Sequence, residues 1–418
     1  MNKSRIKVLI STGNGRLHLI MSAKYLMKHN IDVHILTGWL PRNLDGMLIK
    51  VATFLTKHRN LAAGMKKRFM HESRSSMISC PIPEFLTQFL LLFSRKTKLI
   101  TKDTAVTIGW SFFGWYSSRY INNYDIFHVR AGAGRGGAIK KAIMNNIKVV
   151  VDASIAHPSF FDRNVNSELQ RNNQDPFITL ESKFWKMVLE DCYSADMILV
   201  NSEFVKQTFV ESGFDKNKIR VVYLGVRKDF YKLKALYEKE KVLNILFTGS
   251  FELRKGAEYI LKAAQKFDQE GFAYKLTIVG SSSDAEWLLK KYPVKHIDIV
   301  GHVPQDQLKS YLSSSDVYLF PSLAEGCASS AMEAMAAGLP VIVTNESGLP
   351  VIDGRDGLKI PSMSVHHIVE SIYRLDNDIK LRKILGENAA NTIAEKYSWD
   401  LYAQKVTGIY KEVLKIEE

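Results

Sequence analysis

Cysteine is scarce in this sequence: among 418 residues there are three, Cys80, Cys192 and Cys327. They are widely separated and odd in number, so the sequence predicts neither a disulfide framework nor a clustered zinc motif. We expect all three thiols to be reduced, as they are in a cytosolic protein.

Long hydrophobic runs are also missing. The longest candidate, Phe85 to Phe93, has nine residues and includes Thr87 and Gln88, whereas a membrane helix needs about 18 or more. No signal-peptide pattern is seen, because the apolar residues of Lys7 to Ile10 are followed at once by a polar, glycine-containing stretch. We therefore expect a cytoplasmic protein, and 46% hydrophobic with 24% charged residues is typical of a soluble globular one.

Acidic residues are outnumbered by basic ones, 43 against 57, which gives a formal net charge of +14. Such an excess predicts an anionic partner, which could be nucleic acid, an acidic membrane surface or a phosphorylated substrate. The sequence has no RNA-binding aromatic motif and no zinc framework, so we do not expect nucleic acid.

The stretch 321–344 is the most informative part of the sequence. Apolar residues typical of buried strands flank a helix that Gly338 would end in a left-handed cap, as in a parallel βαβ unit. The start of such a helix favours an anion such as phosphate. Glu325 precedes the helix and Glu333 lies in its first turns, where two carboxylates would suit sugar hydroxyls. Alternatively, Glu333 is only the capping-box partner of Ser330, and Glu325 is a solvated turn residue.

The spacing of Glu325 and Glu333 within this stretch resembles the E-x7-E signature of retaining glycosyltransferase family 4. Members of that family have the GT-B fold, in which two Rossmann-like domains face each other across a cleft. The resemblance implies that Glu333 binds the ribose of a nucleotide and that Glu325 approaches the donor sugar. It also implies that the residues between them bind the donor, namely Gly326, Cys327, Ala328, Ser329 and Ser330.

A second turn is predicted to bind a diphosphate. Arg254 and Lys255 come just before a predicted helix, where cations can neutralise phosphate, although two bases on a turn are often merely solvated. The chain is similar to the family pattern GR....KG at Gly249, Lys255 and Gly256, which implies that Lys255 contacts the diphosphate. It departs from the pattern at Ser250, where the family commonly has arginine, and Arg254 is our candidate for the second charge.

Two more predicted strand ends, at Gly280 and His302, lie in the same half of the chain. The resemblance implies that their loops surround the nucleotide base. The final helix, predicted at 400–418, is similar to the closing helix of the family, which returns to the first domain.

The first half of the chain carries weaker signals. The turn after the first predicted strand contains Gly13 and Gly15, which the resemblance puts on the acceptor side. It is not a dinucleotide fingerprint, because His18 stands where the third glycine would be. His157 follows a predicted strand on a proline-stiffened loop. A lone histidine is more often structural, but the resemblance implies that His157 borders the donor sugar and the acceptor.

A different class of function is indicated by Gly132, Gly134 and Gly137, which fit the pattern G-x-G-x-x-G. Asp152 follows near the position of a ribose-binding acid, as in a nicotinamide or flavin site. The pattern lies in the middle of a domain, however, and an oxidoreductase would leave the pair of glutamates unexplained.

Basic and apolar residues alternate in two segments, 48–70 and 83–98. Interfacial membrane helices have this composition, and so do ordinary amphipathic helices packed on a domain. We favour peripheral association of 48–98 with the inner face of a membrane, because many transferases of the resembled family act on lipid-linked acceptors.

These observations predict an α/β protein of GT-B type. Residues 1–225 would form the acceptor-side domain, closed by the helix 400–418, and 226–241 a linker. Residues 242–399 would form the domain that binds a nucleotide sugar.

The predicted function is that of a retaining glycosyltransferase of hexosyltransferase type. It would move a sugar from a nucleoside diphosphate sugar to a glycan or lipid-linked acceptor, in surface polysaccharide or glycolipid biosynthesis. Lys255 and Arg254 would stabilise the leaving diphosphate, with Glu325 and His157 as the other catalytic candidates. We expect no metal and no cofactor. An NAD(P)-dependent oxidoreductase and an inactive nucleotide-sugar-binding scaffold are the alternatives.

Overall fold

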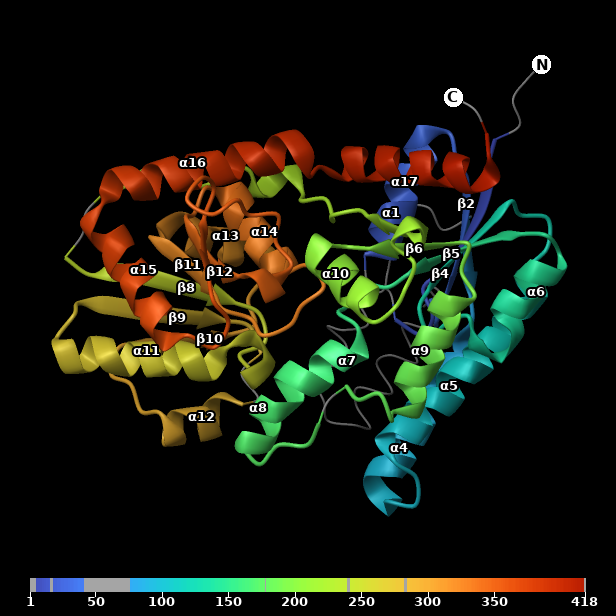
Figure 1. Ribbon diagram of the computed structural model, residues 1–418, viewed down its shortest axis with the longest axis horizontal. Helices are drawn as coiled ribbons and strands as arrows, with labels where there is room; N and C mark the ends of the chain where they lie inside the picture. Colours follow the sequence, from blue (N-terminus) through green and yellow to red (C-terminus); the bar gives the residue numbers. More distant parts are fainter. Residues whose placement is uncertain are drawn as a thin grey trace, which may run out of the picture. The chain divides into compact units, whose positions relative to one another are not determined.

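The computed structural model of the protein describes residues 5–15, 18–40, 76–176, 178–238, 241–281 and 284–416. These residues form two parallel sheets with helices packed around them (Figure 1). The predicted α/β class with two sheets is therefore confirmed. The predicted membrane segment 48–70 lies outside the described residues.

The first sheet has the strand order β3-β2-β1-β4-β5-β6-β7. Its strands are β1 (Lys7–Ser11), β2 (Asp32–Thr37), β3 (Met77–Ser79), β4 (Ile126–Arg130), β5 (Lys148–Asp152), β6 (Met197–Val200) and β7 (Ile219–Val221). Leu9 in β1 pairs in parallel with His34 in β2 and Phe127 in β4. Because β1, β4 and β5 run in parallel, the turns that follow them lie at one edge of the sheet.

The helices of this half are α1 (Leu19–Leu26), α4 (Pro81–Thr97), α5 (Lys102–Ser117), α6 (Ala138–Met144), α9 (Lys183–Tyr193) and most of α17 (Trp399–Leu414). The last of these returns to the first half of the chain, where the hydroxyl of Tyr410 lies 2.7 Å from Nδ1 of the fully buried His128. This hydrogen bond fixes the end of the chain on the first sheet.

The second sheet has the order β10-β9-β8-β11-β12-β13. Its strands are β8 (Leu243–Thr248), β9 (Tyr274–Val279), β10 (Ile297–Gly301), β11 (Val317–Phe320), β12 (Val341–Thr344) and β13 (Leu358–Ile360). The strand order reverses between β8 and β11, and such a reversal opens a crevice at the carboxyl ends of the strands. The turns after β8 and β11 carry the predicted site residues.

The helices of the second half are α7 (Pro158–Phe160), α8 (Asn166–Arg171), α10 (Glu203–Glu211), α11 (Ala257–Glu270), α12 (Ala285–Lys291), α13 (Gln305–Ser314), α14 (Ser329–Ala337), α15 (Val365–Asn377) and α16 (Ile379–Lys396). Helix α14 packs against α16, and α11 packs against α15. Among the described residues, no helix is both long and apolar enough to cross a membrane.

Helix α14 shows one correct and one wrong prediction. Gly338 adopts the left-handed conformation, with φ of 93°, and ends the helix as expected. The capping box is wrong: the N-cap is Ala328, two residues before Ser330, and no side chain caps the helix. The hydroxyl of Ser330 donates to the carbonyl of Thr248 at 3.0 Å instead. A tertiary contact has thus replaced the local one.

By its contacts, the chain forms two compact units. The first contains 1–153, 180–199 and 403–418, and the second contains 154–179 and 200–402. These units group 154–179 with the second half of the chain, unlike the predicted division at 226–241. The predicted domain boundaries stay a prediction.

Candidate functional site

Two turns of the second unit are joined by backbone contacts. The turn after β8 leads into α11, and the turn after β11 leads into α14. The N–H of Leu323 donates to the carbonyl of Arg254 at 2.8 Å, and the hydroxyl of Ser322 donates to the same oxygen at 3.2 Å. Gly256 has φ of +80°, and a Cβ there would lie 2.1 Å from the carbonyl oxygen of Pro321. Glycine is required at this position because the two turns approach so closely.

Charged side chains of the two turns contact one another. One nitrogen of Arg254 lies 2.8 Å from Oε1 of Glu325, and its other nitrogen lies 2.7 Å from Glu252. Nζ of Lys255 is 3.4 Å from the same oxygen of Glu325. Arg254 is therefore engaged by two carboxylates and fixes Glu325, while Lys255 has a looser contact. Lys255 is the cation better able to exchange its partner for a phosphate.

Glu333 is the second glutamate of the site and lies on α14. It is half-buried, and among the described residues no hydrogen bond or ion pair joins it to another side chain. Burial raises its pKa to about 7, while the charge of Arg227 lowers the pKa and that of Asp229 raises it. Asp229 is itself paired with Arg227 and, at 2.8 Å, with Lys309. A buried acceptor of this kind is suited to bind hydroxyl groups.

The turn between these glutamates is tightly packed. The carbonyl of Gly326 accepts a hydrogen bond of 2.5 Å from Ser202, and a Cβ on Gly326 would lie 2.0 Å from the carbonyl oxygen of Ser154. Cys327 and Ala328 are buried, and Ser329 is exposed at the uncapped start of α14. The uncapped N–H groups of this nine-residue helix leave room for an anion.

The strand ends β8, β9 and β10 are linked at the same edge. The N–H of Gly249 donates to Val279 at 2.9 Å, and that of Gly280 donates to Gly301 at 2.8 Å. A Cβ on Gly249 would lie 3.2 Å from Nζ of Lys255, which brings the glycine of the family pattern beside its lysine. Ser250 is half-buried and His302 is exposed, both on these loops.

His157 also belongs to the second unit. Its Nδ1 accepts a hydrogen bond of 3.2 Å from the N–H of Ser159, so the ring proton is on Nε2. Its ring meets those of Phe209 and Phe214 edge-on, at 5.3 and 5.8 Å between centroids. Burial, with a smaller contribution from Arg163, lowers the pKa of His157 to about 4, so the imidazole is neutral at pH 7. Nε2 is buried and has no acceptor among the described residues.

The rival glycine turn is closed by the protein itself. One oxygen of the buried Asp191 accepts hydrogen bonds from the N–H groups of Gly132 at 2.7 Å and Gly134 at 2.9 Å. These are the groups that would have to bind a dinucleotide phosphate. A carboxylate already occupies that place, so the structure argues against the oxidoreductase.

Gly13 and Gly15 lie in the first unit, at the edge of its sheet. A Cβ on Gly13 would lie 2.6 Å from the ring of Trp110, and one on Gly15 would lie 2.5 Å from the guanidinium of Arg130. Arg130 in turn lies over the ring of Trp110, 4.8 Å from its centroid. The two glycines therefore leave space for a stacked cation, and their acceptor-side role stays a prediction.

The cysteines and the possible metal ligands of the protein were also located. The three cysteines are free and buried, and burial raises the pKa of Cys327 to about 12, so this thiol is inert. In the described part of the chain, no group of three or more histidine, cysteine, aspartate or glutamate side chains could hold a metal ion.

Two groups of residues could not be found from the sequence. Asp191 lies on α9, more than 50 residues from the glycines that it closes, and no local pattern connects them. The contacts of the segment 154–179 with α11 were also missed, because its residues form no motif. In the sequence, the segment 154–179 is marked only as a polar, proline-bounded stretch after a strand.

Comparisons with known proteins agree with this arrangement. The profile of the family described as "Glycosyl transferases group 1" matches residues 227–392. An uncharacterized glycosyltransferase of Methanocaldococcus jannaschii, MJ1178, is 31% identical over 53% of this chain and 60% of its own length. The capsular polysaccharide biosynthesis glycosyltransferase CapM of Staphylococcus aureus is 28% identical over 54% of this chain and 64% of its own length. The chain thus spans less than two thirds of these curated relatives.

The similarity of structure extends further than that of sequence. The Anabaena protein HepE, solved in complex with UDP and glucose, is similar over 98% of this chain and all of its own, with a TM-score of 0.62 and 11% identity. At that identity the likeness shows the fold alone.

Proposed function

We propose that the protein is a retaining glycosyltransferase, because residues 227–392 match the profile of the group 1 glycosyl transferases and the chain has the GT-B fold. It moves a sugar, a hexose in our proposal, from a nucleoside diphosphate sugar to a hydroxyl of a glycan or lipid-linked acceptor. The observation that carries this proposal is the contact of Lys255 with Glu325 across two turns joined by hydrogen bonds. Glu333 lies on α14, the helix into which the second of these turns leads.

Each residue has a role in the proposed reaction. Lys255 and the start of α14 bind the diphosphate, Arg254 holds Glu325 toward the donor sugar, and Glu333 accepts hydrogen bonds from the ribose hydroxyls. The bond between the anomeric carbon and the diphosphate oxygen breaks, and its electron pair leaves with the diphosphate, which these positive groups stabilise. The acceptor oxygen attacks from the same face and gives its proton to the departing phosphate oxygen. No metal takes part in this scheme.

His157 supplies a hydrogen bond rather than a proton transfer. In its neutral imidazole, Nε2–H has no acceptor in the part of the chain that the structure describes, and an oxygen of the donor sugar would satisfy it. In the first unit, Gly13 and Gly15 would border the acceptor. The setting that we propose is surface polysaccharide or glycolipid assembly, and the similarity to CapM, a glycosyltransferase of capsular polysaccharide biosynthesis, supports it.

The test is nucleotide binding measured by thermal shift and calorimetry. UDP, GDP, several of their sugars and NAD(P)H are compared on the wild type, Lys255→Ala and Glu333→Ala, with Lys290→Ala and Glu286→Ala on the exposed α12 as matched controls. We expect one diphosphate nucleotide to stabilise the wild type and both controls but neither site variant. Stabilisation by NAD(P)H alone, lost on Gly134→Val, would overturn the proposal. A bound nucleotide sugar that is neither cleaved nor transferred would favour the inactive scaffold.

We also propose that helix α4 binds an anionic membrane surface. Ile82, Phe85, Phe89 and Leu92 recur every three or four residues and are each more than half exposed, with Arg95 and Lys96 in the last turn. An exposed apolar stripe beside basic residues is typical of a helix lying in the lipid interface. The protein should therefore sediment with vesicles containing phosphatidylglycerol. The combined Phe85→Ser and Phe89→Ser variant should not, and equal sedimentation of the two proteins would exclude this role.

A further inference from the structure

The segment 154–179 leaves the first unit and returns to it. Residues up to 153 and from 180 to 199 belong to the first unit, whereas 154–179 belong to the second. The segment begins beside His157 and continues through α7, a π-helical stretch, Phe161–Val165, and α8. Single π-helical turns occur frequently at functional sites. The way in which this segment is attached therefore bears on the site.

At its start, the segment is fixed on α10 and the turn after it. The N–H of His157 donates to the hydroxyl of Thr208 at 3.0 Å, and the hydroxyls of Ser159 and Ser212 lie 2.8 Å apart. With the ring contacts of Phe209 and Phe214, these bonds hold the imidazole in one orientation.

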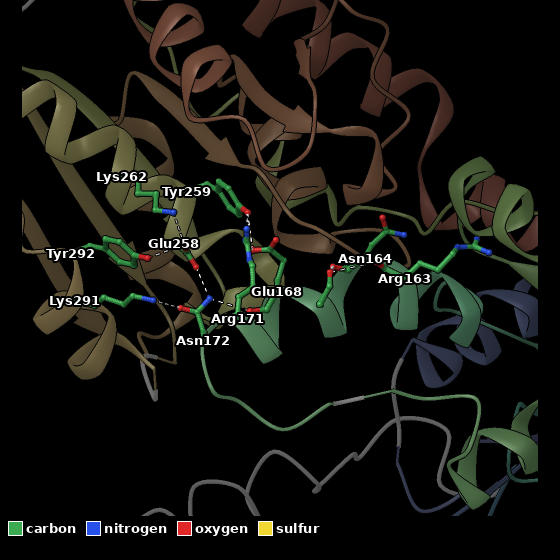
Figure 2. Close-up of polar contacts among 11 residues, drawn as sticks. Arg163, Asn164, Glu168, Arg171, Asn172, Glu258, Tyr259, Lys262, Lys291 and Tyr292 are labelled. Carbon is green, nitrogen blue, oxygen red and sulfur yellow. Dashed lines mark hydrogen bonds and ion pairs between the residues drawn. The ribbon is translucent and has the colours of Figure 1, made fainter.

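At its end, the segment is attached to α11 by two groups of polar contacts (Figure 2). In the first, the buried carboxylate of Glu168 accepts a hydrogen bond of 2.8 Å from the hydroxyl of Tyr259 and is paired with Arg171. Arg171 also donates to the oxygen of Tyr259 at 3.1 Å. Three side chains from α8 and α11 thus form a closed set.

In the second group, the amide of the buried Asn172 donates to Glu258 at 2.7 Å and accepts from Lys291 at 2.6 Å. Glu258 also accepts from Lys262 at 2.6 Å and from Tyr292 at 2.9 Å. The buried carboxylate therefore has three donors. A buried charge is stable only when it is satisfied in this way.

The location of these contacts connects them with the site. Glu258 and Tyr259 are the second and third residues of α11, which begins directly after Lys255 and Gly256. A small cavity between the segment and the turn is lined by Val165 and Leu169 on one side and by Glu252 and Arg254 on the other. The segment that carries His157 is thus bonded to the helix that follows Lys255.

We propose that Glu168, Arg171, Asn172, Glu258, Tyr259 and Lys291, here called the clasp, are positioning residues that set the place of His157 relative to Lys255 and Glu325. This inference rests on the proposed function, because it assigns the clasp to the same donor site. The clasp touches no substrate and acts through His157. Glu168, Asn172 and Glu258 are buried, so the loss of one of these contacts leaves a buried polar group unsatisfied and can shift the segment.

The test compares two tyrosine hydroxyls, that of Tyr259 near the start of α11 and that of Tyr373 on α15, which contacts the last residue of α11. Tyr259→Phe removes the bond to Glu168, and Tyr373→Phe, the matched control, removes the bond to Glu270 at the last residue of the same helix. Asn172→Asp, which faces Glu258 with a second carboxylate, is the stronger clasp variant. UDP-glucose, UDP-galactose, UDP-N-acetylglucosamine and GDP-mannose are the probes, and release of UDP or GDP is measured in the absence of acceptor.

We expect Tyr259→Phe and Asn172→Asp to lower the turnover of the cleaved donor about tenfold while the Kd for the free nucleotide changes less than about twofold, because orientation and not binding is lost. Tyr373→Phe should behave as the wild type. Combining Asn172→Asp with His157→Ala should lower turnover no further than His157→Ala alone, since the clasp acts through that residue. Hydrogen exchange of residues 158–172 should be faster in the clasp variants and unchanged in the control.

The outcomes separate the two proposals. Suppose that the enzyme cleaves one of the probes. The clasp proposal alone would then be overturned if the turnover losses of Asn172→Asp and His157→Ala added up in the combined variant. It would also be overturned if Tyr373→Phe lowered turnover as much as Tyr259→Phe. Unchanged hydrogen exchange in Asn172→Asp would do the same. A wild type that binds and cleaves none of the probes would contradict the proposed function and, with it, the role of the clasp.

Discussion

At the scale of single residues, the two glutamates of the E-x7-E signature have opposite surroundings. Glu325 is paired with Arg254 and Lys255, so its charge is already compensated. Glu333 has no side-chain hydrogen bond or ion pair within the described part of the chain, and burial chiefly raises its pKa to about 7. A ligand that donates hydroxyl groups would relieve the cost of ionising Glu333, whereas at Glu325 it would have to compete with two cations.

This difference predicts a pH dependence of nucleotide binding. Ribose hydroxyls are bound best by the ionised carboxylate, and the fraction of Glu333 that is ionised rises as pH rises through about 7. UDP, if it is the nucleotide bound, should bind up to about tenfold more tightly at pH 8 than at pH 6. Calorimetry at the two pH values measures this.

The matched variant for that measurement is Glu333→Gln, which keeps the size of the side chain and cannot ionise. The terminal phosphate of UDP also titrates in this range, so the informative quantity is the difference in pH dependence between the two proteins. An identical dependence in wild type and Glu333→Gln would show that Glu333 does not bind the ribose.

At this scale, residues could be located from the sequence where the signal was local, and their roles stay a prediction. Lys255, Gly256 and Glu325 belong to short patterns tied to strand ends, and parallel strands bring such ends together. The double pairing of Arg254 and the neutral state of His157 could not be predicted, because both depend on burial by distant elements.

At the scale of elements, a glycine pattern took a different role from the expected one. The turn at Gly132 and Gly134 has the spacing of a phosphate loop, yet α9 supplies Asp191 to its N–H groups. Burial raises the pKa of Asp191 to about 7, although both backbone bonds lower it. The pattern specifies a turn with inward N–H groups, and only the packing of another helix decides whether a ligand or a side chain fills it.

Removal of that carboxylate should destabilise the protein and leave nucleotide binding unchanged. Asp191→Ala leaves two buried N–H groups without acceptors, which we expect to cost about 2–4 kcal/mol of unfolding free energy. Asp191→Asn keeps an acceptor oxygen and should cost less. Urea unfolding measures both. A stable Asp191→Ala that gains affinity for NAD(P)H would revive the dinucleotide interpretation of the turn.

At the scale of the whole molecule, the two parallel sheets could be predicted because each strand and helix carries its own periodicity and punctuation. The grouping of 154–179 with the second unit could not, since its attachment consists of polar contacts such as Asn172 with Glu258. In a sequence, polar side chains that form such contacts cannot be told apart from ordinary surface residues. The return of the chain's end to the first unit was suggested by family resemblance, and the bond between Tyr410 and His128 gives it a physical basis.

The division into two units predicts two transitions in calorimetric unfolding. A nucleotide stabilises only the unit that binds it, so a saturating UDP or GDP should raise the transition of the second unit and leave the other in place. Tyr410→Phe should change the transition of the first unit and leave that of the second in place. It leaves Nδ1 of the buried His128 without a partner, which should lower the transition of the first unit by about 3–6 °C. If instead both changes move one common transition, the two units unfold cooperatively, and the donor site cannot be treated as a property of the second unit by itself.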